Sequence, residues 1–395
     1  MEPLLPEQAA VEDLAIALTR EAAALGGVLH PVTRRSLADL LRIANTYHSN
    51  LIEGHDSRPR DIERAIAQDY ASEPSRRALQ LEALAHLEVQ RLAEERLESD
   101  PALSPASVAF LRWLHQEFYG RLPKELRYVS DETNTRKLEV IPGELRTEEL
   151  RVGRHLPPEP SLVPRFLERF EEAYNPSGLG PLMGTAALGA SHHRLLWIHP
   201  FTDGNGRVAR LHSDAMIRWL GLGAHGLWTV SRGLARKRPE YLRLLEAADA
   251  ERWNDHDGRG HRSARALVEF CRWFLEVCLD QVRYMSASLD LDTLSARITE
   301  YVERRSSGGL GPRLPGEARH LLIACLTLGE VPRGEATRLT GLGERTARKI
   351  LVQCVRERLL VSDTPKGPVR LGIPAAVAEW YFPQLYPAGA LEEES

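Results

Sequence analysis

HPFTDGNGRVAR, residues 199–210, lies between two segments with helical periodicity, 181–197 and a run that begins just after 204. Gly204 and Gly206 allow consecutive backbone N–H groups to turn inward where the second helix begins, and the helix dipole adds to their attraction for an anion. The stretch therefore predicts a helix, a tight loop and a second helix, with a phosphate site at the junction.

The side chains of this stretch supply the other groups that phosphate chemistry needs. Arg207 and Arg210 lie three residues apart in the first turns of the second helix and can clamp phosphate oxygens. Asp203 offers a hard carboxylate for Mg²⁺, and His199 can act as a general base near neutral pH. A base, a metal ligand, an anion site and two cations together indicate phosphoryl or nucleotidyl transfer.

Each of these features has an ordinary explanation when it stands alone. A loop of Asp, Gly and Asn is often only a turn, a histidine before proline is often structural, and two arginines often form a solvated helix face. Their joint occurrence within twelve residues favours a chemical site. The loop is not a Walker loop, because the Gly-Lys-Ser/Thr ending is absent.

Helical periodicity extends outward from this loop over most of the first 290 residues. Apolar residues recur at three and four positions from Leu37 to Leu51, and Gly54 ends that helix. Another predicted helix has Ser104 as its N-cap. Further helical runs are expected at 75–98, 161–174, 239–248 and 263–285. The exception is 128–160, which predicts a short hairpin or an extended loop.

Composition limits the class of protein. The 395 residues carry a formal net charge of −4, so a nucleic-acid partner would need a local basic surface. The four cysteines are too scattered for a disulfide framework or a zinc site. The N-terminus lacks the basic residues of a signal peptide, and no stretch stays apolar for the length of a bilayer. We therefore expect a cytoplasmic protein with no membrane partner.

The C-terminal part has a different pattern. A Gly- and Arg-rich linker precedes three short helical segments and two strand-like pieces around a Lys-Gly-Pro turn, which predicts a winged helix-turn-helix. Its third helix carries four basic residues, namely Arg345, Arg348, Lys349 and Arg356. Such a domain could bind DNA, dock a protein or form a homodimer, and the sequence leaves these partners open.

The loop at 199–210 resembles the signature of the Fic family, His-x-Phe-x-Asp/Glu-Gly-Asn-Gly-Arg-x-x-Arg, and meets every fixed position. The likeness continues through SHHRLLWI and, more loosely, over 30–285. It implies that an AMP group moves from ATP to a Tyr, Thr or Ser hydroxyl of a target protein. Family members that phosphorylate instead tend to lose the Gly-Asn-Gly-Arg run, so its presence here favours AMP transfer.

The resemblance also implies roles for single residues. His199 would deprotonate the target hydroxyl, and Asp203 would hold Mg²⁺. Arg207 would bind the β-phosphate side, and Arg210 the γ-phosphate. The residues that would cradle the α- and β-phosphates are Gly204, Asn205 and Gly206.

Two further segments fit the same family. VIPGELRTEELRVG at 140–153 is similar to the flap that aligns the target chain by strand pairing, although an ordinary surface hairpin would look alike. Tyr241 lies where the family often contacts adenine. Asp249 stands where some members have Asn, which leaves the preference for the nucleotide base open.

Ser49-Asn-Leu-Ile-Glu53-Gly54 resembles the inhibitory motif Ser/Thr-x-x-x-Glu-Gly/Asn of this family. Ser49 and Glu53 lie four residues apart and therefore share one face of a helix. A glycine after a helix-ending glutamate is also a common helix terminus. With the signature loop present, the motif predicts that Glu53 inhibits the enzyme within the same chain.

The sequence thus predicts a mainly α protein: an all-helical Fic domain with a small β-hairpin flap, followed by a winged-helix domain. We expect an N-terminal helical region with the inhibitory helix at 1–100, a catalytic core at 101–290, a linker at 291–316 and the winged helix at 317–395. The expected activity is a protein adenylyltransferase that uses ATP and Mg²⁺. Two alternatives are a DNA-binding transcriptional regulator with a nucleotide-sensing core, and an enzyme that mainly removes AMP.

Overall fold

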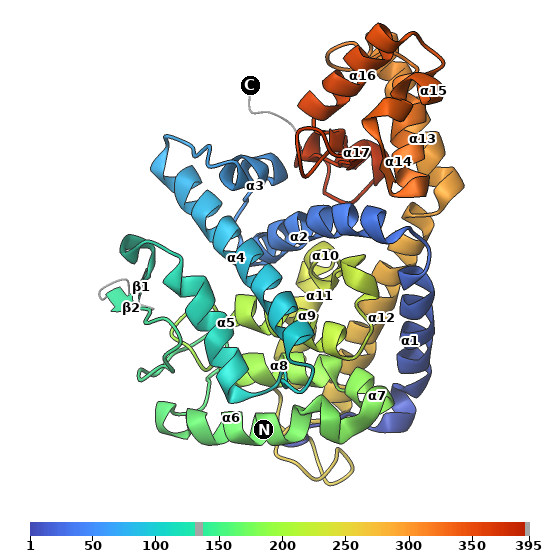
Figure 1. The fold of residues 1–395 in the computed structure, drawn as a ribbon. Coiled ribbons are helices and arrows are strands. Elements are labelled where there is room, and N and C mark those ends of the chain that lie inside the picture. The colour runs from blue at the N-terminus through green and yellow to red at the C-terminus, as the bar shows by residue number, and fades with distance from the viewer. Residues whose placement is uncertain (131–136, 392–395) are drawn as a thin grey trace.

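The computed structural model describes residues 1–130 and 137–391, apart from the side chain of Gln8. Its architecture is mainly helical, with a small antiparallel hairpin and a separate three-stranded sheet, which confirms the predicted mainly α fold (Figure 1). The helices of the first 290 residues are α1 (Glu12–Gly26), α2 (Pro31–Glu53), α3 (Pro59–Ile66), α4 (Pro74–Ser99), α5 (Val108–Gly120), α6 (Val163–Tyr174), α7 (Pro176–Ala186), α8 (Leu188–Ile198), α9 (Asn205–Trp219), α10 (Val230–Arg236), α11 (Arg238–Ala248) and α12 (Ala264–Ser288).

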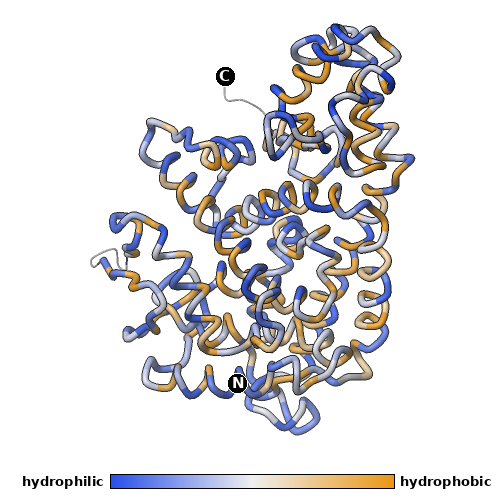
Figure 2. Tube along the Cα trace, in the orientation of Figure 1, coloured by the Kyte–Doolittle hydropathy of each residue, from blue (hydrophilic) through white to orange (hydrophobic). Residues whose placement is uncertain are grey.

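Helix α8 lies at the centre of the bundle, because it packs against α6, α9 and α12. Ten of its eleven residues are buried. Gly189 marks the crossing with α12, since a Cβ there would lie 2.9 Å from the Cα of Cys271. The apolar faces of the surrounding helices point toward this centre, and their polar faces are turned outward (Figure 2). The loop that follows α8 is therefore held on a rigid element.

The hairpin lies earlier than the flap resemblance suggested. Strands β1 (Tyr128–Ser130) and β2 (Lys137–Glu139) pair in antiparallel register, with Val129 opposite Leu138. The turn between them falls outside the described residues. Residues 140–153 themselves contain no strand, and only an isolated bridge joins Val152 to His155.

Two sequence-based expectations on helix boundaries were wrong. Helix α5 is capped by Ser107, whose Oγ accepts from the N–H of Phe110, while Ser104 accepts from the N–H of Ala106 in the preceding turn. The segment expected as a linker begins with a helix, α13 (Leu291–Ser306). Its apolar face, which includes Ile298, is buried against α14 and α17. Most of its charged residues are exposed, whereas Arg305 is buried and pairs with Glu357.

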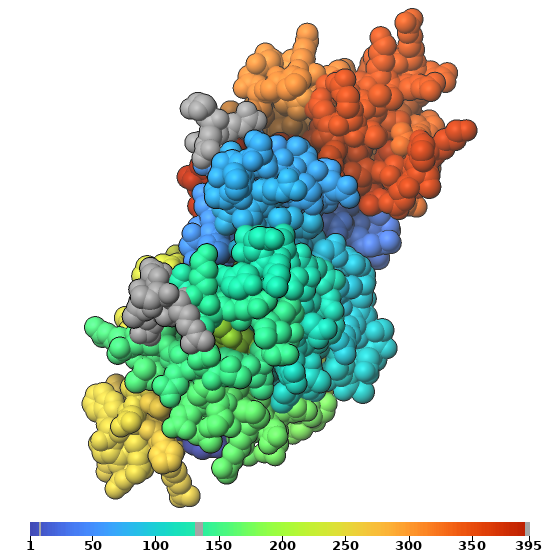
Figure 3. Space-filling view, turned by 90° about the vertical axis from the view of Figure 1, so that its left-hand side faces the viewer, coloured from blue at the N-terminus to red at the C-terminus, as the bar shows by residue number. Residues whose placement is uncertain are grey.

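The C-terminal part contains α14 (Ala318–Leu328), β3 (Glu330–Val331), α15 (Ala336–Thr340), α16 (Glu344–Arg356), β4 (Leu360–Val361), β5 (Val369–Leu371) and α17 (Ala375–Tyr381). The three strands form one antiparallel sheet in the order β3-β5-β4. We call residues 291–391, which include α13–α17 and this sheet, the C-terminal unit; it projects from one end of the helical core (Figure 3). Helix α2 runs between the two parts and contacts both (Figure 1).

Within the described residues, no helix combines the length and apolar character needed to cross a bilayer.

Candidate active site

The loop after α8 is shaped by its own side chains. His199 ends α8 in the left-handed conformation (φ 50°, ψ 62°), and Gly204 caps α9 at φ 76°. The Asn205 amide bonds both backbone groups of Phe201, accepting from its N–H (2.9 Å) and donating to its carbonyl (2.8 Å). The Phe201 ring is buried and stacks on His115 at 4.0 Å between ring centroids. The side chain of Asn205 therefore fixes the loop. Only its backbone N–H is left to bind a ligand.

His199 is neutral at physiological pH. Burial, and then the nearby His155 and Arg146, lower the pKa of its imidazole to about 4. Arg146 also fixes the backbone, because its Nε donates to the carbonyl of His199 (2.7 Å) and its N–H to the carbonyl of Pro200 (2.9 Å). An unprotonated imidazole at this position can accept a proton, which is the predicted role of His199.

Asp203 is held as a carboxylate. Burial opposes its ionisation, but the charge of Arg207 and a hydrogen bond from Tyr119 outweigh this and lower its pKa. The Oη of Tyr119 donates to Oδ2 of Asp203 at 2.5 Å. A single ionised carboxylate suits Mg²⁺, which commonly takes one or two protein carboxylates and completes its shell with water and substrate phosphates.

Arg207 is surrounded on three sides. Its Nη1 lies 3.1 Å from Oε2 of Glu82 on α4, and its Nη2 lies 3.7 Å from Oδ2 of Asp203. The guanidinium carbon stands 4.8 Å from the ring centroid of Phe118. Its Nε has no hydrogen-bond partner among the described residues. The same Glu82 oxygen lies 2.8 Å from Nδ1 of His55, so one carboxylate joins the arginine to a histidine.

Arg210 is paired with the residues of the predicted inhibitory motif. It is 1% exposed, its Nε donates to Oγ of Ser49 (2.8 Å), and its Nη2 donates to the carbonyl of Ser49 (3.2 Å) and to Oε1 of Glu53. Burial raises the pKa of the Glu53 carboxyl, but the charge of Arg210 dominates and the net shift is downward. A Cβ on Gly206 would lie 2.3 Å from Oε1 of Glu53, so the carboxylate lies directly against the glycine of the loop.

A cavity of about 390 Å³ connects several of these residues. Its lining includes His199, Gly206, Arg210, Tyr241 and Glu53. The cavity also takes in 152–155, which follow the hairpin, and one side of α11 from Arg238 to Glu246.

The remaining predicted residues, Ser49, Gly204, Asn205, Asp203 and Arg207, are not among the residues lining the cavity. The latter two face Tyr119 and Glu82 instead.

Tyr241 contributes its ring to this cavity, but its hydroxyl is already used. Its Oη lies 2.7 Å from Nε2 of His192, and its ring stacks on Trp273 at 6.1 Å. Asp249, on the same side of the cavity, lies 3.1 Å from Nδ1 of His155 and 3.3 Å from Nε2 of His193. This end of the cavity thus presents an ionised carboxylate held by two histidines.

The sequence reasoning missed four residues that shape the site, namely Glu82, His115, Tyr119 and Arg146. They lie on α4, on α5 and in the loop after β2, far from the signature along the chain. A pattern within one segment carries no information about such partners. Only the burial expected for one face of α5 could have placed Tyr119 near another element.

Comparisons with known proteins agree with this geometry. Residues 105–217 match the model of the Fic/DOC family. A protein adenylyltransferase Fic of Drosophila erecta is 36% identical over 75 residues, which is 19% of this chain and 15% of that protein. Another, of Drosophila grimshawi, is 35% identical over 168 residues, or 42% of this chain and 30% of that protein. The chain thus matches less than a third of the length of these curated relatives.

The fold has a counterpart among solved structures. The crystal structure of a Fic family protein from Desulfovibrio desulfuricans G20 aligns with a TM-score of 0.52 and 18% sequence identity, covering 94% of this chain and 98% of that chain. At this identity the likeness concerns the fold.

Proposed function

Residues 105–217 form a domain of the Fic/DOC family, and from this premise we propose that the protein transfers AMP from ATP to a Tyr, Thr or Ser hydroxyl of another protein. The observation that carries the proposal is that a neutral histidine, an arginine and a glycine-shaped helix start border one cavity. These groups are the ones that nucleotidyl transfer to a hydroxyl requires. The adenylyltransferase names of the Drosophila relatives support the same reaction.

In this reaction His199 accepts the proton of the target hydroxyl. The hydroxyl oxygen forms a bond to the α-phosphorus of ATP, the bond from that phosphorus to the bridging oxygen breaks, and pyrophosphate leaves. Bound phosphates would raise the pKa of His199 from its low value toward neutrality, where a general base is most effective. The N–H groups at Gly204, Asn205 and Gly206 stabilise the phosphates at the start of α9.

Asp203 is the residue that would hold Mg²⁺. The ion would neutralise phosphate charge as it develops on the leaving group. Tyr119 orients the carboxylate, and Arg207, kept close by Glu82 and Phe118, supplies a further positive charge.

We further propose that Glu53 inhibits this reaction. Its carboxylate occupies Arg210 and lies against Gly206, so a γ-phosphate at Arg210 would have to compete with it for the same donors. A displaced triphosphate leaves the α-phosphorus out of line with the attacking hydroxyl. Such misplacement can cost a factor on the order of a hundred in rate.

The test compares four proteins incubated with ATP labelled at the α-phosphorus and with Mg²⁺. We expect Glu53→Gln, which keeps the shape and removes the charge, to label itself or added proteins roughly a hundredfold faster than the parent. Glu168→Gln, on the exposed face of α6, is the matched control and should behave like the parent. His199→Ala combined with Glu53→Gln should not label. Equal labelling with and without His199 would contradict the proposal.

The same assay examines removal of AMP. Glu53 borders the cavity beside His199, so its carboxylate could orient a water molecule toward an AMP-modified protein. If the parent removes AMP from a modified target and Glu53→Gln does not, then Glu53 takes part in catalysis of removal.

A second proposed function rests on α16. Arg345, Arg348, Lys349 and Arg356 are all exposed and lie on one face of this helix. The element order of the C-terminal unit supports a winged helix-turn-helix, in which α16 would be the recognition helix. We therefore propose that this unit binds the phosphate backbone of duplex DNA, with docking of a protein as the competing outcome.

A further inference from the structure

Three successive carbonyls after α17 are each bonded by a side chain from the helical core. Tyr284 on α12 donates to the carbonyl of Pro383 at 3.0 Å. Arg232 on α10 donates to that of Gln384 from Nη2 at 2.7 Å, and Nε2 of His48 on α2 lies 2.8 Å from that of Leu385. A short stretch of the C-terminal unit is therefore seated by donors from three different helices.

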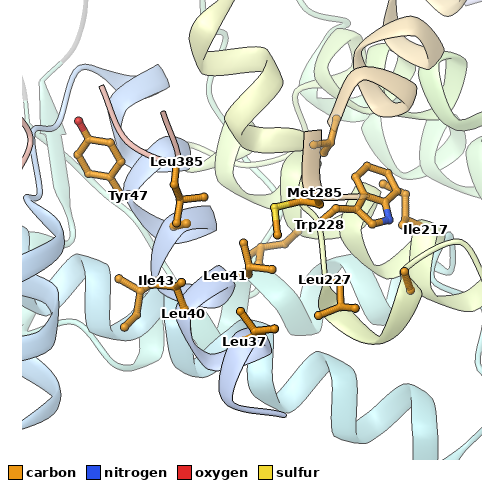
Figure 4. Packing of buried hydrophobic residues seen from close by; sticks show 14 of the residues in the cluster. Leu37, Leu40, Leu41, Ile43, Tyr47, Ile217, Leu227, Trp228, Met285 and Leu385 are labelled. Atoms are coloured by element: carbon orange, nitrogen blue, oxygen red, sulfur yellow. The ribbon is translucent and has the colours of Figure 1, made fainter. Parts of the chain in front are cut away.

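Apolar packing reinforces this seat on α2. Leu385 is 1% exposed and reaches into the row of apolar side chains along α2, next to Tyr47 (Figure 4). The next residue, Tyr386, makes an edge-to-face contact with Tyr47 (5.5 Å between ring centroids) and a stacked contact with His48 (6.1 Å). The hydroxyl of Tyr386 has no hydrogen-bond partner among the described residues, so the ring itself is the functional part.

The residues that receive this stretch directly precede the inhibitory contact. His48 is followed in the chain by Ser49, whose hydroxyl and carbonyl both accept from Arg210. Glu53, one helical turn further, completes the pairing with Arg210. The first turn of α2 is attached to the same C-terminal unit, because the hydroxyl of Thr33 donates to the carbonyl of Leu326 at 3.0 Å. Helix α2 thus has contacts to the C-terminal unit near both ends.

We propose that Phe382–Tyr386, here called the latch, holds α2 in the position that places Glu53 on Arg210. Withdrawal of the latch, for example when a partner binds and shifts the C-terminal unit, releases α2 and activates the enzyme. This inference rests on the proposed AMP transfer and on inhibition by Glu53. It adds the element of this chain that keeps the inhibitory helix in place.

The chemistry of the seat favours a mechanical latch over a pH switch. Burial, with smaller contributions from the charges of Arg232 and Arg236, outweighs the hydrogen bond to Leu385 and lowers the pKa of His48 to about 3. The imidazole therefore stays neutral across the physiological range, and its bond to the carbonyl of Leu385 does not depend on pH. The latch is held by packing and by neutral or permanently charged donors.

The experiment places latch variants in two backgrounds, the parent and Glu53→Gln. Tyr386→Ala removes the ring that packs on Tyr47 and His48, and we expect self-labelling with ATP to rise roughly two- to tenfold in the parent. In the Glu53→Gln background the same change should add nothing, because the inhibitory carboxylate is already absent. Tyr386→Phe, which removes only the unpartnered hydroxyl, is the matched control and should label like its background.

The outcomes separate the latch from the proposed function. Strong labelling by Glu53→Gln together with an unchanged Tyr386→Ala in the parent background would overturn the latch alone, and so would an equal increase in both backgrounds. If Tyr386→Ala fails to fold, Tyr386→Leu keeps most of the volume and loses the ring contacts. If no variant labels, hydrogen exchange of the backbone amides of 45–53 tests the latch directly. The latch predicts faster exchange in Tyr386→Ala than in the parent, and unchanged exchange would refute it.

Discussion

Glycine is required at position 204 for two separate reasons. Its φ of 76° lies in the left-handed region, and a Cβ would stand 2.7 Å from Cε2 of Tyr119. We expect Gly204→Ala to lower the free energy of unfolding by roughly 1–3 kcal/mol and to abolish AMP transfer, because Tyr119 must move away from Asp203. Thermal unfolding and the labelling assay check this. Gly178→Ala, at a site where a Cβ meets nothing within 4 Å, is the control.

The pKa of His199 predicts a pH profile. Its value of about 4 means that the base becomes protonated, and thus inactive, only as pH falls through that region. We expect kcat/KM of Glu53→Gln, whose pH dependence reports the pKa values of the free enzyme, to be nearly constant from pH 6 to pH 8 and to decline in acid. A profile that rises steadily through pH 6.5 would show an unperturbed histidine instead.

Glu82 controls the titration of His55. The hydrogen bond to Glu82 is the main cause of the raised pKa of His55. We expect Glu82→Gln to lower this pKa, as followed by NMR of the ring protons. Because the folded pKa is raised, this pair stabilises the protein at low pH, and the contribution is lost as pH rises through the folded pKa. A pKa of His55 that stays unchanged in Glu82→Gln would contradict the contact.

At this scale the sequence predicts residues within one segment and misses their partners. The signature at 199–210 is contiguous, so its order alone indicated a base, a carboxylate and two arginines. The roles of these residues remain predictions. Tyr119 and Glu82 reach the site only through packing of α4 and α5, and their sequence surroundings are those of ordinary amphipathic helices. The side-chain amide of Asn205 bonds both backbone groups of Phe201, which the signature does not reveal, and the proposed phosphate contact belongs to its backbone N–H.

Among the helices, α2 carries the proposed inhibition and α16 the proposed DNA binding. Helix α2 ends where the periodicity predicted, because Gly54 adopts the left-handed conformation (φ 87°) and its N–H bonds the last turn. The boundary of α13 could not be read in the same way. Its exposed charges resemble those of a linker. Packing of Ile298 and its neighbours against α14 and α17 is what stabilises it as a helix of the C-terminal unit.

The basic face of α16 predicts salt-dependent binding. We expect Arg348→Ala with Lys349→Ala to weaken binding of random duplex DNA across sequences and to reduce the slope of log K against log salt by about 2. Gel shifts at several salt concentrations measure this. Replacing Arg338, which is exposed on α15 but pairs with Glu335, is a control. An unaffected gel shift would assign the nucleic-acid contact to another surface.

For the molecule as a whole, the proposed inhibition and the stability of the fold depend on one ion pair, Glu53 with Arg210. Glu53→Gln removes the negative charge that faces a buried arginine, and we expect it to lower the free energy of unfolding by roughly 1–3 kcal/mol. Since the folded pKa of Glu53 is lowered, its contribution is present at neutral pH and is lost as pH falls through that pKa. Stability of the parent should therefore decline more steeply in acid than that of Glu53→Gln. Parallel pH–stability curves from urea unfolding would argue against the pair.

The length of α2 has a mechanical consequence. With 23 residues it is a rigid rod of about 35 Å, fixed at its first turn by the bond from Thr33 to the C-terminal unit. For a rod of this length, rotation by roughly 5° about that turn would move its far end by about 3 Å. That displacement exceeds the tolerance of a hydrogen bond, so the contact between Glu53 and Arg210 would open. The rod is a lever arm, which would turn an angular shift too small to disturb the packing at its pivot into the loss of the contact between Glu53 and Arg210.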